Sequence, residues 1–225
     1  MASNGLLRPA NDEEGIMVLN AILNDDSVDL EETLVSNGSE SVKRKSMITL
    51  RPKTWLNDEI ISYYLKVALK NRDDFFCKQD TNRKRNYFYN SFFMQNLLDE
   101  YNDIDPTCRG IYNYAKVSTW GRKCPGGDIF KLKHIFVPIN IEHVHWVLAV
   151  IYMEEKKICW YDSLHNTDEV RLKALLQYLK DEHRNIHKEE LEDKNEWKLI
   201  GCFANCPQQE NSESNITIDH ITTFS

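Results

Sequence analysis

Two residues of the sequence, His145 and Asp162, have the types and the spacing of an acid–base pair. His145 precedes an apolar run of strand type, Trp146–Tyr152, and Asp162 ends the next such run, Lys157–Asp162. The polar stretch between the runs, Glu154–Lys156, has the length of a hairpin connection. The two residues should therefore face each other at the open end of a hairpin, about 5 Å apart. In a catalytic triad, the third member is a carboxylate that orients the histidine. The alternative is that His145 is an ordinary half-exposed histidine.

A second segment has residues that suit the binding of an oxyanion. The run from Cys206 to Asn211 reads CPQQEN, and its second glutamine is Gln209. A glutamine side-chain amide can donate a hydrogen bond to the negative oxygen that develops during acyl transfer. The alternative is a polar loop whose glutamines are solvated. On its own, this segment does not decide between the two.

The histidines and cysteines of the sequence do not have the spacing of a metal site. His143 and His145 together with Cys202 and Cys206 contain the ligand types of a zinc site, but this spacing is not that of a zinc finger. His183 and His187 lie four residues apart, and no glutamate follows His183 as in the HExxH motif. We therefore predict no metal site.

Composition limits the class of protein. The 225 residues carry 28 basic and 35 acidic side chains, a net charge of −7, and 41% of them are hydrophobic. An acidic chain argues against a general nucleic-acid binder, so the basic triplets Lys43–Lys45 and Arg83–Arg85 are interpreted as solvated surface. The sequence contains neither an apolar run long enough to span a membrane nor a secretory signal. We expect a soluble intracellular protein whose six cysteines are reduced.

The expected elements alternate irregularly, which is typical of an α+β fold. Residues 1–45 are acidic and weakly patterned; we expect a loosely ordered segment with one short helix near Val18–Leu23. The folded domain is expected at 46–225. Its predicted elements are a strand at Met47–Leu50, a helix at Trp55–Lys70 that Asn57 or Asp58 caps, a loop at Arg72–Arg85, a strand and then a helix within Asn86–Leu98, strands at His134–Pro138, Trp146–Tyr152 and Lys157–Asp162, a helix at Thr167–His183 that Asn166 or Thr167 caps, and a strand at Trp197–Phe203.

Several short motifs, in their order along the chain, resemble those of the Ulp/SENP family of cysteine proteases, which process the small modifier SUMO and remove it from conjugates. The motifs are WLND at 55–58, VPI at 137–139, HW at 145–146, YDS at 161–163 and PQQ-x-N at 207–211. The resemblance runs from about Met47 to Asn211. It implies a papain-like α+β fold, in which a helical lobe packs on a mixed central sheet with the cleft between them. It also implies a monomer that needs no cofactor and that acts in the nucleus.

The resemblance assigns a role to each matching residue. His145 corresponds to the general base, Asp162 to the acid that orients it, and Gln209 to the donor of the oxyanion site. Trp55 and Trp146 correspond to an aromatic pair that forms a narrow tunnel over the Gly-Gly tail of the modifier, and their alternative is core packing. Asp58 corresponds to an acid that meets a basic residue of the modifier, and its alternative is a helix cap.

The pattern departs from the family after Asn211. The family continues with a segment like N-G-x-D-C-G, whose cysteine nucleophile stands six residues past the glutamine. In this chain that position is Asn215, and the aspartate, cysteine and glycine are all absent. An amide cannot act as a thiolate, so we predict that the chain does not cleave. The C-terminal helix that follows in the family is also expected to be missing, as after a changed reading frame or alternative splicing.

Two further classes of function remain open. One is a non-catalytic SUMO-binding module, which would keep the tunnel and the surface for the modifier. The other is a protease for a different ubiquitin-like modifier, such as the one used in neddylation. Cys202 and Cys206 precede Gln209 in the chain, so neither is expected to replace the missing nucleophile.

Overall fold

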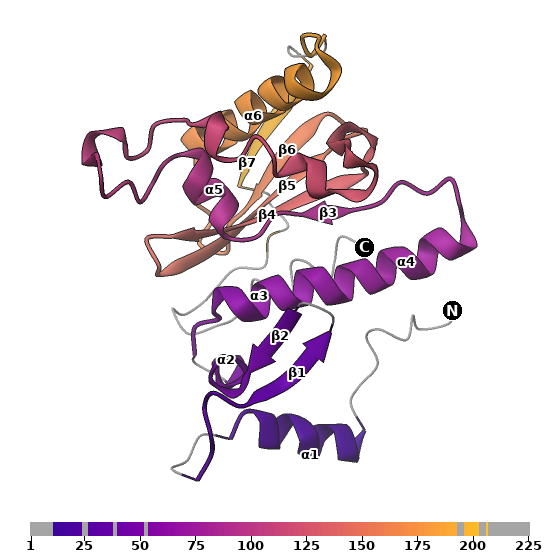
Figure 1. Cartoon of the computed structure of the whole chain (residues 1–225), viewed down its shortest axis with the longest axis vertical. Coiled ribbons are helices and arrows are strands. Elements are labelled where there is room, and N and C mark those ends of the chain that lie inside the picture. Colours follow the sequence, from indigo (N-terminus) through magenta and orange to yellow (C-terminus); the bar gives the residue numbers. More distant parts are fainter. Residues whose placement is uncertain are drawn as a thin grey trace.

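A mixed sheet of five strands lies at the centre of the computed structural model, which describes residues 11–23, 27–37, 40–51, 54–192, 196–202 and 206 (Figure 1). The strand order is β3-β4-β5-β6-β7. The three central strands are antiparallel, while β3 and β7 each run parallel to their neighbour. The strands are β3 (Tyr87–Phe88), β4 (His134–Ile141), β5 (His145–Tyr152), β6 (Lys157–Tyr161) and β7 (Lys198–Cys202).

The central strands form because their apolar runs can be buried on both faces of the sheet. Alternate side chains of β5 enter two separate cores: Val147, Ala149 and Ile151 pack on one face, and Trp146, Leu148, Val150 and Tyr152 pack on the other. The predicted strands at 134–138, 146–152 and 157–162 are thereby confirmed, as is the α+β class.

A long helical run covers the second of these faces. It begins at Asp58, after the side chain of Asn57 accepts a hydrogen bond from the backbone N–H of Ile60, and comprises α3 (Asp58–Tyr64), a π-helical turn (Leu65–Leu69) and α4 (Lys70–Gln79). Figure 1 shows it lying across the sheet. The predicted loop at Arg72–Arg85 is wrong for its first half. The apolar pattern fades there, but ion pairs such as Lys70 to Asp74 support an exposed helix.

The opposite face of the sheet is covered by α5 (Phe92–Leu97) and α6 (Glu169–His187). Helix α6 buries one stripe of side chains, including Leu175, Tyr178 and Leu179. The side chain of Asp168, rather than Asn166 or Thr167, caps its start by accepting from the backbone N–H of Arg171. Five short 3-10 turns lie between α5 and β4, at Pro106–Cys108, Tyr114–Lys116, Gly121–Lys123, Pro125–Gly127 and Ile129–Lys131.

The N-terminal part adds α1 (Asp12–Ala21), a hairpin of β1 (Thr33–Asn37) and β2 (Glu40–Lys43), and α2 (Arg44–Met47). The hairpin lies on the side of the long helical run that faces away from the sheet (Figure 1). No residue of α1 is buried. The predicted strand at Met47–Leu50 is wrong, because a 3-10 turn forms at Ile48–Leu50, where the hydroxyl of Thr49 donates to the backbone carbonyl of Ser46.

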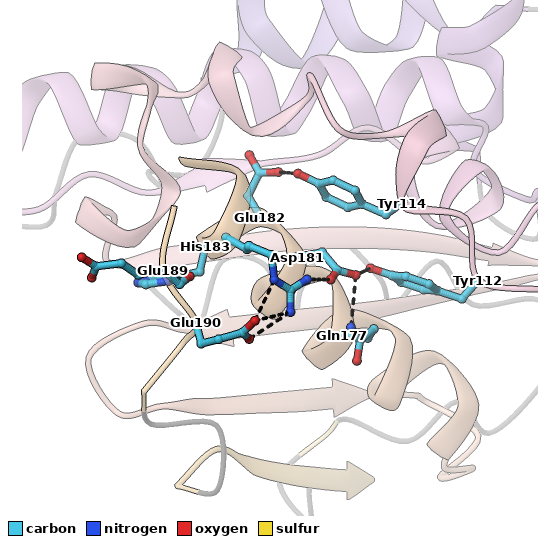
Figure 2. A network of polar contacts seen from close by, with 9 residues as sticks. Tyr112, Tyr114, Gln177, Asp181, Glu182, His183, Glu189 and Glu190 are labelled. Carbon is cyan, nitrogen blue, oxygen red and sulfur yellow. Dashed lines mark hydrogen bonds and ion pairs between the residues drawn. The ribbon is translucent and has the colours of Figure 1, made fainter. Parts of the chain in front are cut away.

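Two tyrosines join the segment of 3-10 turns to two acids of α6, of which Glu182 is buried and Asp181 is partly buried (Figure 2). The hydroxyl of Tyr112 donates to Asp181 at 2.7 Å, and that of Tyr114 donates to Glu182. Glu182 is fully buried, and burial raises its pKa although the hydrogen bond from Tyr114 opposes the rise. The turn at Tyr114 and the helix are therefore joined by a hydrogen bond to a fully buried acid.

Gly121 shows how tight this contact is. A Cβ atom at Gly121 would overlap the carboxylate of Glu182 and lie 3.1 Å from the hydroxyl of Tyr178. Gly121→Ala should therefore lower the free energy of unfolding by about 1–3 kcal/mol, as overpacking does. Gly15→Ala is the control, since a Cβ there meets nothing within 4 Å. Urea denaturation of both variants measures the effect, and equal stabilities would contradict it.

Candidate active site

His145 and Asp162 lie in direct contact, with Nε2 of the imidazole 2.7 Å from Oδ1 of the carboxylate. The pairing of the strands differs from the expected one. Tyr152 pairs with Lys157 and Leu148 pairs with Tyr161, so the position opposite Asp162 is that of Val147. The two side chains are therefore diagonal neighbours on one face rather than an opposed pair. The imidazole is long enough to cross this distance.

Asp162 is fixed from several directions and is 1% exposed. Its Oδ1 also accepts the backbone N–H of Leu164 at 2.8 Å, and its carbonyl accepts the N–H of His165. Burial acts to raise the pKa of Asp162, but the hydrogen bonds from His145 and Leu164 outweigh it and hold this pKa below its usual range. The carboxylate is therefore ionised at neutral pH and is positioned to orient the imidazole.

Trp146 follows His145 and ties β5 to the segment before α3. Its indole Nε1 donates to the backbone carbonyl of Leu56 at 2.8 Å, and the side chain is 8% exposed. Trp55, next to Leu56 in the chain, is 50% exposed. Core packing thus accounts for much of Trp146 but not for Trp55, a large aromatic residue that is left open to solvent next to Leu56 in the chain.

Asp58 is exposed at the first position of α3, and the cap of that helix is Asn57. The helix-cap alternative for Asp58 is therefore wrong, because the side chain that accepts the N–H of Ile60 is that of Asn57. The exposed carboxylate stands three residues from Trp55 in the chain. Its predicted contact with a basic residue of a modifier remains a prediction.

Two thiols lie close to Asp162. The Sγ of Cys202 is 4.0 Å from the backbone carbonyl of Asp162, and Cys206 is buried. Burial and the charge of Asp162 raise the pKa of the Cys202 thiol. Burial, with smaller contributions from Cys202 and Asp162, raises the pKa of Cys206 to about 12. Both groups are thus protonated thiols at neutral pH, which is the opposite of an activated nucleophile.

Gln209 and Asn215 lie outside the described residues. Within the described part of the chain, no three His, Cys, Asp or Glu side chains converge as metal ligands do, and no helix there is both long and apolar enough to cross a membrane. Sequence reasoning missed the backbone groups of the site. The carbonyl of Leu56 and the N–H of Leu164 carry no side-chain signal, so only the fold reveals them.

Asp162→Asn should destabilise the fold in a pH-dependent way. The folded pKa lies below the ordinary value of 3.8, so the ionised carboxylate stabilises the fold above about pH 4 and this contribution is lost as pH falls further. We expect the variant to lose about 1–2 kcal/mol at pH 7 and to approach the wild type in stability below pH 4. Urea titrations across this range measure the difference. Asp58→Asn, an exposed control, should change stability by less than about 0.5 kcal/mol; a pH-independent loss for Asp162→Asn would contradict the assignment.

Comparison with known proteins agrees with this arrangement. A family model described as the C-terminal catalytic domain of the Ulp1 protease family matches residues 54–214. The chain is 34% identical to a sentrin-specific protease of Caenorhabditis elegans over 67% of the chain and 19% of that protein. It is 31% identical to the ubiquitin-like-specific protease ESD4 of Arabidopsis thaliana over 78% of the chain and 33% of that protein. The chain thus spans a third or less of the length of these relatives.

A solved structure gives the same result at the level of the fold. The C-terminal Ulp1 protease domain, determined in complex with SMT3, the yeast ortholog of SUMO, superposes with a TM-score of 0.65 at 28% identity. The match covers 94% of this chain and 80% of that one. The fold, the order of the motifs and the family model agree, and the chain therefore belongs to the Ulp1 protease family.

Proposed function

We propose that this chain recognises the C-terminal Gly-Gly tail of SUMO, as a SUMO protease does, and that it binds this tail without cleaving it. The observation that carries the proposal is the contact of His145 with Asp162 at the start of β5, next to Trp146, whose indole donates to the carbonyl of Leu56, the chain neighbour of the exposed Trp55. Membership of the Ulp1 family and the match to a domain solved with the yeast ortholog of SUMO support it.

Each residue has a role in this proposal. Trp55 and Trp146 bracket the tail, and only residues without side chains pass between two indoles, which selects Gly-Gly by exclusion. Asp58 meets a basic residue of the modifier. His145 and Gln209 keep the positions of the family's base and oxyanion donor, but with Asn215 at the position of the nucleophile they have no thiol proton to take and no oxyanion to stabilise. Because Nε2 of His145 faces Asp162, Nδ1 is the ring nitrogen that is left for contact with the tail, and no cofactor takes part.

The absence of cleavage follows from the sequence and from the chemistry of the thiols. Asn215 occupies the position of the nucleophile, counted from Gln209. The nearby thiols of Cys202 and Cys206 have raised pKa values and do not supply a thiolate. Binding of SUMO conjugates, a monomeric state and a nuclear location stay predictions.

Isothermal titration with mature SUMO and with SUMO lacking its last two glycines tests this proposal. If the tail enters a tunnel, its removal should weaken binding about tenfold or more, since the interactions buried at the centre of an interface carry most of the affinity. Equal affinity for both forms would overturn the role of the tail. The modifier used in neddylation serves as the comparison; tighter binding of that modifier would favour a different specificity within the same family.

A further inference from the structure

A cavity of about 300 Å³ lies at the opposite end of the sheet from His145. It is enclosed by the start of α4, by β3 and by the turn at Lys123–Pro125. Strand β3 pairs with the first residues of β4, whereas His145 pairs with Ile141, the last residue of β4. The cavity and the candidate active site are therefore separated by the length of the central strands.

The floor of the cavity is apolar. Leu69 and Cys124 are almost completely buried, and the rings of Tyr87 and Phe88 are half-buried in the outermost strand of the sheet. One acid, Asp73, belongs to the lining, and it is 4% exposed. Its two oxygens accept the backbone N–H and the side-chain amide of Asn86, at 2.5 and 2.9 Å. Asp73 therefore has its acceptors occupied within the fold.

The rim of the cavity is basic. Lys70 and Arg85 share one acid, Asp74, at 2.8 and 2.6 Å. The ammonium of Lys123 lies 5.8 Å from the centre of the Trp120 ring, and among the described residues it forms no ion pair. The cavity and its rim thus carry three cations, Lys70, Arg85 and Lys123, against the two carboxylates of Asp73 and Asp74, in a chain whose net charge is −7.

The positive charge extends past the rim. Arg72 and Arg83 both lie over the ring of Phe76, at 5.6 and 4.8 Å, and neither forms an ion pair within the described part of the chain. Burial and the neighbouring charge of Arg83 lower the pKa of Arg72. Two members of the basic triplet Arg83–Arg85 are thus more than solvated surface, because Arg85 lines the cavity and Arg83 lies against Phe76, whereas Lys84 pairs with Glu154 away from the cavity.

We propose that this cavity is a docking site for an acidic peptide segment of a partner protein that carries one bulky apolar side chain. The apolar side chain fills the floor formed by Leu69, Tyr87 and Phe88, and the flanking carboxylates pair with Lys123 and Arg85. A cavity of this volume lies at the small end of the range for ligand sites, which suits a single side chain rather than a folded surface. The apolar floor favours a peptide over a nucleic acid, whose backbone needs charge alone.

Fluorescence anisotropy on the full chain tests the proposal with defined probes. The main probe is a labelled pentapeptide with phenylalanine between two pairs of glutamates. One control peptide has alanine at its centre, another has lysines in place of the glutamates, and a labelled single-stranded oligonucleotide represents nucleic acid. The site is mapped by Lys123→Glu, and Lys173→Glu on α6 makes the same charge change at an exposed lysine outside the cavity.

We expect the phenylalanine peptide to bind at or below about 1 mM, with affinity falling as salt rises. Lys123→Glu should weaken it about fivefold or more, while Lys173→Glu leaves it unchanged. The alanine and lysine peptides should bind at least about fivefold more weakly. The proposal is overturned if the peptide does not bind, if alanine serves as well as phenylalanine, if Lys123→Glu has no effect, or if the oligonucleotide binds more tightly. Since the assay involves no SUMO, its failure leaves the proposed function standing.

Discussion

Replacing Trp55 by alanine should weaken the binding of SUMO by about 30-fold or more, close to 2 kcal/mol, because tryptophan is among the residues that carry most of the energy of an interface. Trp55 is half exposed, whereas its partner Trp146 is buried and hydrogen bonded. The exposed residue is therefore the better one to change, since its loss should leave the fold intact. Titration of the variant with mature SUMO gives the loss in affinity.

Phe75→Ala is the matched control for this experiment. Phe75 is also a 50% exposed aromatic residue, but it lies on α4, well along the helical run from Trp55. We expect its removal to leave SUMO binding unchanged. An unchanged affinity for Trp55→Ala, or an equal loss for both variants, would contradict the predicted tunnel.

Trp160→Ala should be the most destabilising of the substitutions considered. Trp160 is fully buried in β6, two residues before Asp162, and it is the largest such side chain in the described part of the chain. Removing a buried tryptophan costs about 3–5 kcal/mol through lost contacts and the cavity left behind. Against a total stability of about 5–15 kcal/mol, this loss brings the fold close to unfolding. Thermal and urea denaturation measure it.

Trp160→Phe separates packing from hydrogen bonding. The indole Nε1 of Trp160 is buried and has no hydrogen-bond partner among the described residues. Phenylalanine retains most of the apolar contacts and loses no hydrogen bond to the described residues, so this variant should cost well under half as much as the alanine variant. Equal losses would contradict the role of packing, because the remaining aromatic ring would then contribute nothing.

The central sheet could be predicted from the sequence because its signal is local. The runs in β4, β5 and β6 are apolar throughout, and α6 repeats leucines at helical spacing. The hairpin of β1 and β2 gives no such signal; Val42 is buried only because the long helical run packs over it. The extension of that run to Gln79 likewise depends on ion pairs and on tertiary contacts rather than on an apolar pattern.

The candidate site, like the fold, could be predicted from the sequence only in part. The spacing of His145 and Asp162 predicts their contact, but the pairing of Tyr152 with Lys157 places Val147, two residues from His145, opposite Asp162. The role of Leu56 as the acceptor for Trp146 requires two segments ninety residues apart to meet. The cavity beside the basic triplet Arg83–Arg85 could not be predicted from the sequence, because β3, α4 and the turn at Lys123 enclose it only in the folded chain.

The most direct test of the account is the reaction of the full chain with SUMO that carries a vinyl sulfone at its C-terminus. The catalytic domain of yeast Ulp1, which has a catalytic cysteine, is the positive control. We predict that unmodified SUMO binds the chain and that its mass does not change on incubation with the probe, since no thiolate stands beside His145. A covalent adduct on this chain, at Cys202, Cys206 or any other residue, would contradict the account.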